Sequence, residues 1–158
     1  MPTWIGSSNN AGSPILRIRI EGHSEEQGQE FDAIIDTGFT GFISMPAVSA
    51  FPLGLILEGT TSTTLADGSQ SPKFVASGSA VVSGERQRGT ILLNFGPSDV
   101  LVGMEFITSF RKTLFVYEQV VALFDNADVA EFIKSMVRAA TAAAEAAKSP
   151  PPPSATHS

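Results

Sequence analysis

The sequence of 158 residues contains no cysteine, which excludes disulfides, thiol nucleophiles and cysteine-based metal sites. It has two histidines, His23 and His157, and they are too few and too far apart for a histidine metal site or a Ser-His triad. No segment approaches the ~20 apolar residues of a membrane span. Residues 1–13 lack the basic start and apolar run of a signal peptide. We therefore expect a soluble, cytoplasmic protein with no metal, no cofactor and no membrane partner, in which carboxylates remain available for chemistry.

Positive charge is also scarce. Ten lysines and arginines stand against 16 aspartates and glutamates, giving a net charge of −6 and a pI of about 4.8. A nucleic-acid-binding protein needs a basic patch, and none stands out here, so we expect no nucleic-acid partner. Hydrophobic residues make up 42% of the chain, which is enough for the core of one domain.

The sequence pattern predicts short strands over most of the chain. Leu16, Ile18 and Ile20 alternate with two arginines, which is the period of a half-buried strand. The run 31–36 then predicts the second arm of a hairpin that ends at Asp36. Further strands are expected at residues 42–45, 59–65, 70–82, 88–94, 100–102, 113–117 and 120–124, with short helices near 47–51 and 104–110. Such a pattern predicts a mainly β domain and not an α/β nucleotide-binding fold.

The two ends of the chain have a different composition. Residues 1–13 are small and polar apart from Trp4 and Ile5, and we expect a flexible N-terminal arm. Residues 125–148 predict an amphipathic helix, because apolar residues recur on one face from Val129 to Ala140. Packing on its own domain and packing on a partner chain both explain that stripe. Prolines follow from Pro150, and residues 149–158 are expected to be disordered. The main domain is thus expected at 14–124.

The stretch around which the chain is organised is Ile34-Ile35-Asp36-Thr37-Gly38. A carboxylate placed directly after a buried strand lies at the edge of the core, where its environment can tune its pKa. Thr37 offers a hydroxyl that can hold the turn, and Gly38 lets another backbone come close. The same tripeptide also suits an ordinary turn, in which Asp36 caps backbone N–H groups.

Two further motifs follow in order. Ala66-Asp67-Gly68-Ser69 lies between two β-prone runs and predicts a hairpin turn. Val100-Leu101-Val102-Gly103 is a second apolar run that ends at glycine, and Met104-Glu105-Phe106 follows it. Turn chemistry alone explains the first motif, and core packing alone explains the second. Their combination with Asp-Thr-Gly in one order is far more specific than any of the three.

On these three motifs, residues 14–124 resemble the retropepsin-like aspartic proteases, in particular the single-domain bacterial type. The resemblance implies a small closed β-barrel with short helices and a C-terminal α-helix. It implies a homodimeric endopeptidase in which Asp36, Thr37 and Gly38 of each chain form one catalytic site. Ala66, Asp67, Gly68 and Ser69 would form the tip of a flap over a polypeptide substrate, and the run ending at Gly103 would lie under the active-site loop.

The chain departs from the retroviral members of that family at two places. Thr40 and Met104 stand where those enzymes carry an Asp and an Arg that pair with each other. Interleaved terminal strands close the retroviral dimer, whereas here a long helix follows the last strand. A second function therefore stays open, that of a catalytically silent domain acting as a peptide-binding or dimerisation module.

Overall fold

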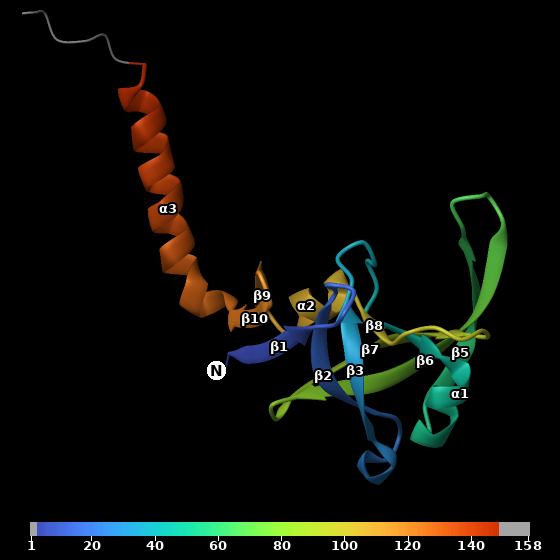
Figure 1. The fold of residues 1–158 in the computed structure, drawn as a ribbon. Coiled ribbons are helices and arrows are strands. Elements are labelled where there is room, and N and C mark those ends of the chain that lie inside the picture. The colour runs from blue at the N-terminus through green and yellow to red at the C-terminus, as the bar shows by residue number, and fades with distance from the viewer. Residues whose placement is uncertain (1–2, 149–158) are drawn as a thin grey trace, which may run out of the picture. The chain divides into compact units, whose positions relative to one another are not determined.

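The computed structural model describes residues 3–148. The expected disordered tail at 149–158 lies outside the described residues, as do residues 1 and 2. The chain forms two compact units, one up to Asp125 and one from Asn126 onward. The first unit is mainly β (Figure 1), as the alternating sequence predicts. The second unit holds a single helix within its described part.

The described residues of the first unit, 3–125, contain ten strands, two short α-helices and two 3₁₀ turns. In chain order these are β1 (Trp4–Ser8), β2 (Pro14–Glu21), η1 (Glu25–Gln27), β3 (Gln29–Ile35), β4 (Ile43–Pro46), α1 (Ala47–Ala50), η2 (Phe51–Leu53), β5 (Ile56–Thr64), β6 (Gln70–Val82), β7 (Glu85–Asn94), β8 (Leu101–Val102), α2 (Met104–Ser109), β9 (Lys112–Tyr117) and β10 (Val120–Asp125). The expected hairpins β2–β3, β5–β6 and β9–β10 are all present as antiparallel pairs.

All ten strands belong to one sheet, in the order β5-β6-β7-β4-β8-β3-β2-β1-β10-β9. Strand β6 also pairs with β2, so the sheet curls back on itself around the core. Strand β8 is the short link in this arrangement. It runs parallel to β3 and antiparallel to β4, and it thereby joins the strand that ends beside Asp36 to the other half of the sheet.

The core follows the period-two pattern of the sequence. Leu16, Ile18 and Ile20 of β2 are at most 2% exposed, whereas Arg17 points outward and pairs with Asp32 of β3. Burying a side chain of this size contributes about 1.5–3 kcal/mol. Because Arg17 points outward, the other face of β2 is exposed to solvent. Alternation in the sequence therefore decides which face of β2 supplies the core.

The N-terminal segment differs from the expected flexible arm. Residues 4–8 form strand β1, which pairs with β10 and β2. The reason is Trp4, which is 1% exposed and packs with its ring centroid 4.8 Å from that of Phe110. Its indole N–H donates to Glu85 at 3.1 Å. A fully buried tryptophan with a satisfied N–H holds this segment against the sheet.

A buried ion cluster lies beside Trp4. The Nζ atom of Lys112 is 2.8 Å from both Glu85 Oε1 and Asp125 Oδ1, and it lies 4.5 Å from the centre of the Trp4 ring. The Lys112 side chain is fully buried. Burial lowers the pKa of Lys112, but its hydrogen bonds to Asp125 and Glu85 outweigh this and raise the pKa above its ordinary value. The cluster thus links β9 and β10 to the first residue of β7.

Helix α3 spans Asn126–Ala146 and forms the described part of the second unit. Its apolar residues recur at helical spacing as the sequence predicts, and Phe132, Ile133, Met136 and Val137 are each 46–64% exposed. Glu131 and Lys134 pair with each other at 2.8 Å on the surface of the helix. Within residues 3–148, no helix is long and apolar enough to cross a membrane.

Candidate active site

The Asp36 loop begins where β3 ends. The backbone N–H of Asp36 donates to the carbonyl of Val102 at 2.9 Å, which continues the pairing between β3 and β8. The side chain then folds over its own turn, because its Oδ1 atom accepts the backbone N–H of Gly38 at 2.9 Å. Asp36 is half-buried, while Thr37 and Gly38 are exposed. The carboxylate is thus held by the backbone at the edge of the core, with room for a further partner.

The apolar run ending at Gly103 lies directly against this loop. The backbone N–H groups of Met104 and Glu105 donate to the carbonyls of Phe39 and Thr40 at 2.8 and 3.1 Å. A Cβ atom on Gly103 would lie 2.3 Å from the carbonyl oxygen of Gly41. Only glycine permits so close a contact between two backbone segments. The second motif therefore positions the first, although the two lie more than sixty residues apart in the sequence.

A cavity of about 530 Å³ opens beside Asp36. Asp36 and Thr37 contribute its polar edge. The other lining residues are mostly apolar and come from four separate parts of the first unit: Ser13, Pro14, Ile34, Ile35, Leu101, Leu114 and Val116. The cavity is thus a mostly apolar hollow with one carboxylate in its lining, which is the usual make-up of a small-ligand or substrate site.

Sequence reasoning missed four residues of this cavity: Ser13 and Pro14, where β2 begins, and Leu114 and Val116 of β9. The last two belong to a strand that follows Asp36 by almost eighty residues. Their alternation predicted a strand but gave no sign of where that strand would lie. Only the pairing of β9 with β10, and of β10 with β1, brings them to the Asp36 side of the sheet.

The third motif forms the tip of the β5–β6 hairpin, as its turn residues predict. Gly68 has φ +83°, which favours glycine, and its N–H donates to the carbonyl of Leu65 at 2.9 Å. Asp67 Oδ1 accepts from the hydroxyl and the N–H of Ser69, at 2.6 and 2.9 Å. These hydrogen bonds lower the pKa of Asp67, with the Ser69 hydroxyl as the main cause. The carboxylate of Asp67 thus stabilises the turn.

The hairpin tip, Ala66–Ser69, is exposed and is not among the residues that line the Asp36 cavity. All nine residues of β5 are exposed as well. In Figure 1 the hairpin and the Asp36 loop extend toward the same side of the sheet. The structure therefore brings Asp36 and Thr37 together in one cavity and leaves the four tip residues outside it, at the end of a projecting arm.

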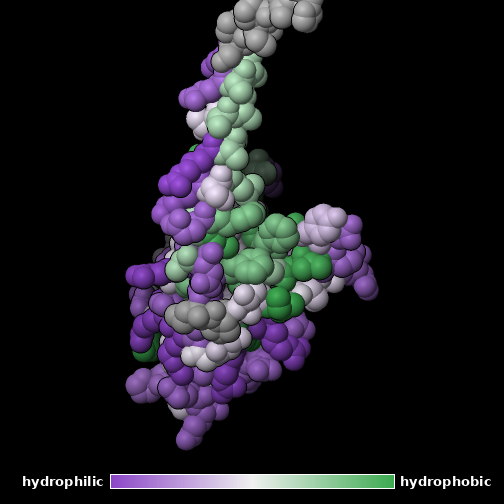
Figure 2. Space-filling view, turned by 90° about the vertical axis from the view of Figure 1, so that its left-hand side faces the viewer, coloured by the Kyte–Doolittle hydropathy of each residue, from purple (hydrophilic) through white to green (hydrophobic). Residues whose placement is uncertain are grey.

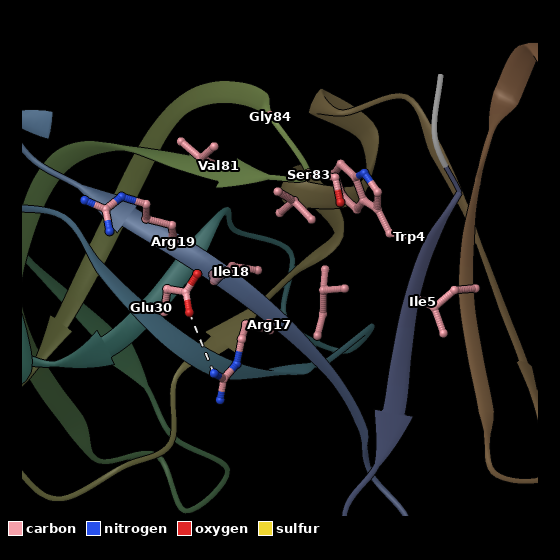
Figure 3. A pocket seen from close by; sticks show the side chains of 11 residues that line it. Trp4, Ile5, Arg17, Ile18, Arg19, Glu30, Val81, Ser83 and Gly84 are labelled. Carbon is pink, nitrogen blue, oxygen red and sulfur yellow. Dashed lines mark ion pairs between the residues drawn. The ribbon is translucent and has the colours of Figure 1, made fainter.

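A second cavity, of about 380 Å³, lies between β2 and the turn from β6 to β7 (Figure 3). Arg17 and Arg19 lie at its edge, but both are neutralised by carboxylates. Arg17 pairs with Asp32 at 2.9 Å and Glu30 at 3.7 Å, and Arg19 pairs with Glu21 at 2.9 Å. This cavity therefore offers no net positive charge to an anionic ligand. Among residues 3–148, no three His, Cys, Asp or Glu side chains are grouped to hold a metal ion.

Comparison with known proteins agrees with this geometry at the level of the fold. No protein-family model and no curated protein matches the sequence. Among solved structures, the chain is similar to the crystal structure of a retropepsin-like aspartic protease from Rickettsia conorii, with a TM-score of 0.56 and 17% sequence identity. The match covers 77% of this chain and 89% of that one. The first unit thus has the retropepsin-like fold.

Proposed function

We propose that this protein is a homodimeric aspartic endopeptidase in which each chain contributes one Asp36. The observation that carries the proposal is the position of this carboxylate. Asp36 is half-buried, held by the N–H of Gly38, and placed at the rim of an otherwise apolar cavity. The likeness of the fold to an aspartic protease supports the same reading. A cavity of this kind accepts a side chain of a peptide while the carboxylate faces its backbone.

The reaction needs a second carboxyl group, which a second copy supplies. Peptide hydrolysis with water requires a base to take a proton from the water and an acid to protonate the carbonyl oxygen. One chain offers a single Asp-Thr-Gly motif. Two copies of Asp36 within hydrogen-bond reach share one proton, because two adjacent carboxylates cannot both ionise easily. The pair then provides both groups in an isologous two-fold contact.

In the proposed mechanism, water is the nucleophile. The ionised Asp36 accepts a proton from the water, whose oxygen attacks the scissile carbonyl carbon. The protonated Asp36 donates its proton to the carbonyl oxygen, so the tetrahedral intermediate is neutral. Its collapse breaks the C–N bond as one carboxyl group of the dyad gives its proton to the departing amine nitrogen, while the other takes a proton from a hydroxyl of the intermediate, which leaves the product acid and the dyad with one proton again. No covalent acyl-enzyme forms along this route. The hairpin tip, Ala66–Ser69, would close over the peptide during the reaction.

The test is a pH–rate profile on a mixed peptide library, for the wild type and for Asp36→Asn. Cleavage should follow a bell-shaped curve on the acid side of neutral, because activity needs the dyad with one proton and is lost with two or none. Asp36→Asn should abolish cleavage and leave the fold and the dimer intact. Asp32→Asn is the matched control, since Asp32 precedes the site on the same strand but is exposed and pairs with Arg17. Equal activity in wild type and Asp36→Asn would remove Asp36 from the mechanism.

The second candidate function is a silent module that binds peptides without cutting them. The absence of the Asp and Arg pair of the retroviral enzymes, at Thr40 and Met104, favours this candidate. Here the backbone of Met104 and the carbonyl of Phe39 form the link between the two segments instead. Peptide binding in equilibrium dialysis, with no new peptide fragments by mass spectrometry at any pH, would select this function over the first.

A further inference from the structure

The turn between β1 and β2 is held by a single residue, Asn9. Its Oδ1 atom accepts the backbone N–H groups of Ala11 and Ser13, at 3.0 and 2.8 Å. Its own N–H donates to the carbonyl of Ser13, and its carbonyl accepts the N–H of Gly12, both at 2.9 Å. Gly12 has φ +81°, which favours glycine. Asparagine is suited to such turns, because its side chain can bond to the backbone two residues on. Four hydrogen bonds of Asn9 therefore fix the position of Ser13.

The turn leads directly into the candidate active site. Ser13 and Pro14 line the cavity of about 530 Å³ that also contains Asp36. The pairing of β2 with β3 explains this position, because Ile15 lies opposite Ile34 in antiparallel register. Two steps further along the same register, Ser13 corresponds to Asp36. Residues that are opposite each other in an antiparallel pair point to the same face, so the two side chains share one face.

The hydroxyl of Ser13 is available to a ligand. The N–H and the carbonyl of Ser13 are both used within the turn. Its hydroxyl, in contrast, forms no hydrogen bond with any other residue of the described range, 3–148. Ser13 is half-buried. A serine hydroxyl offers one donor and two acceptor lone pairs, so Ser13 presents a hydrogen-bonding group beside the carboxylate.

The surroundings of this hydroxyl are mostly apolar. Asp36 and Thr37 supply the other polar side chains in the cavity lining, and the remaining lining residues are apolar. Nearby, Phe115 of β9 and Val120 of β10 are each 53% exposed. Figure 2 views the molecule from the side on which these strands lie and shows hydrophobic side chains gathered there. A ligand without a hydrogen-bonding group would leave the Ser13 hydroxyl desolvated and unpaired, which a binding site penalises.

We propose that Ser13 is a specificity-determining residue of this site and that Asn9 is the residue that positions it. The Ser13 hydroxyl binds the hydroxyl of a threonine side chain in the peptide, while the methyl group of that side chain contacts the apolar lining. The site therefore prefers threonine to valine, which has nearly the same shape but no hydroxyl. The proposal rests on the proposed function, because it takes the ligand of the cavity to be a peptide.

The test compares two libraries of short peptides that are identical except for Thr or Val at one fixed position, which is varied from library to library. Their dissociation constants are measured by equilibrium dialysis on full-length Asp36→Asn, so that binding is observed without cleavage. We expect Thr to be preferred at one position by about threefold to tenfold. Adding Ser13→Ala should bring this ratio close to one, and Ser13→Thr should keep it. Ser7→Ala is the matched control, since Ser7 is exposed on β1 outside the cavity.

The role of Asn9 is tested in the same assay. Asn9→Ala removes two hydrogen bonds of the turn and should lower the Thr/Val ratio, whereas Asn9→Asp keeps the acceptor oxygen and should restore it. The fluorescence of Trp4, the single tryptophan, checks that β1 stays packed. The pH profile of cleavage should keep its shape in Asn9→Ala and Ser13→Ala, because neither residue titrates. If Asn9→Ala alters the Trp4 emission, Ser13→Ala decides, since it keeps the backbone bonds of the turn.

The outcomes separate this proposal from the proposed function. If the wild type cleaves peptides but Ser13→Ala leaves the Thr/Val ratio unchanged, the role of Ser13 is overturned and the endopeptidase stands. If the ratio depends on Ser13 but the wild type cleaves nothing at any pH, the role of Ser13 stands and the endopeptidase fails. An unchanged ratio in Asn9→Ala with normal Trp4 emission overturns the positioning role of Asn9. If no peptide is bound or cleaved, both proposals are overturned.

Discussion

Replacing Lys112 by methionine should strongly destabilise the first unit. The ammonium group lies 2.8 Å from both Glu85 and Asp125, and these carboxylate side chains are only 15% and 10% exposed. Lys112→Met leaves both largely buried negative charges without this ammonium group. Removing one partner of a buried ion pair costs about 3–5 kcal/mol, because the remaining charge stays desolvated. The contact with the Trp4 ring is also lost. We expect a loss of about 4 kcal/mol, out of a total stability of roughly 5–15 kcal/mol.

Urea denaturation followed by tryptophan fluorescence measures this loss, since the single tryptophan lies beside Lys112. Arg17→Met is the matched control. Arg17 also faces two carboxylates, Asp32 and Glu30, but these side chains are 58% exposed. Solvent screens such a pair, so this substitution should cost less than about 1 kcal/mol. Adding Glu85→Gln to Lys112→Met should restore part of the lost stability, because it removes one of the two buried charges.

The pH dependence follows from the raised pKa of Lys112. A lysine whose pKa is higher in the folded than in the unfolded protein contributes its full stabilisation below the ordinary value of 10.5. That contribution is lost as the pH rises through the raised value. The stability difference between wild type and Lys112→Met should therefore stay constant from neutral pH to about pH 9 and shrink above about pH 10.5. Equal losses in Lys112→Met and Arg17→Met, both below 1 kcal/mol, would refute the reasoning that burial makes this cluster strong.

Three further predictions concern the candidate site. Gly103→Ala would place a Cβ atom 2.3 Å from the Gly41 carbonyl oxygen, so the Asp36 loop must shift. The kcat/KM of peptide cleavage should fall at least about tenfold. The free energy of unfolding in urea should fall by about 1–3 kcal/mol. Ser69→Ala removes the main hydrogen bond that lowers the pKa of Asp67, so that pKa should rise toward its ordinary value in an NMR titration. An unchanged titration would contradict a hydrogen bond between the Ser69 hydroxyl and the Asp67 carboxylate. The amides of residues 66–69 should exchange rapidly without substrate, because little burial fixes the tip, and slow exchange there would count against a flap.

The candidate site shows how far each motif could be interpreted from the sequence. Asp36 was predicted at the end of a strand, and it follows β3 directly. The hairpin at Asp67-Gly68 was predicted from turn chemistry, and it forms with Gly68 in the left-handed region. Both predictions depend only on residues that are adjacent in the sequence. The backbone preferences of such residues are enough to predict the end of a strand or a turn. Catalysis by Asp36, dimer formation and the role of the hairpin tip as a flap stay predictions.

Local pattern by itself determined most of the strands and the C-terminal helix of this protein, but not strand β1. The alternation of Leu16, Ile18 and Ile20 fixes one face of β2 as core, because side chains of a strand point alternately to its two faces. The 3.6-residue spacing of apolar residues likewise determined α3, whose sequence favours a helix without reference to the sheet.

The tertiary structure alone decided what surrounds those elements. Trp4 became part of a strand because Phe110, Glu85 and Lys112, all more than eighty residues away, form its surroundings. Val116 came to line the Asp36 cavity through two successive strand pairings. The physical reason is the same in both cases. Burial and ion pairing depend on which segments meet in space, and a local pattern gives the face of a strand but not its neighbour.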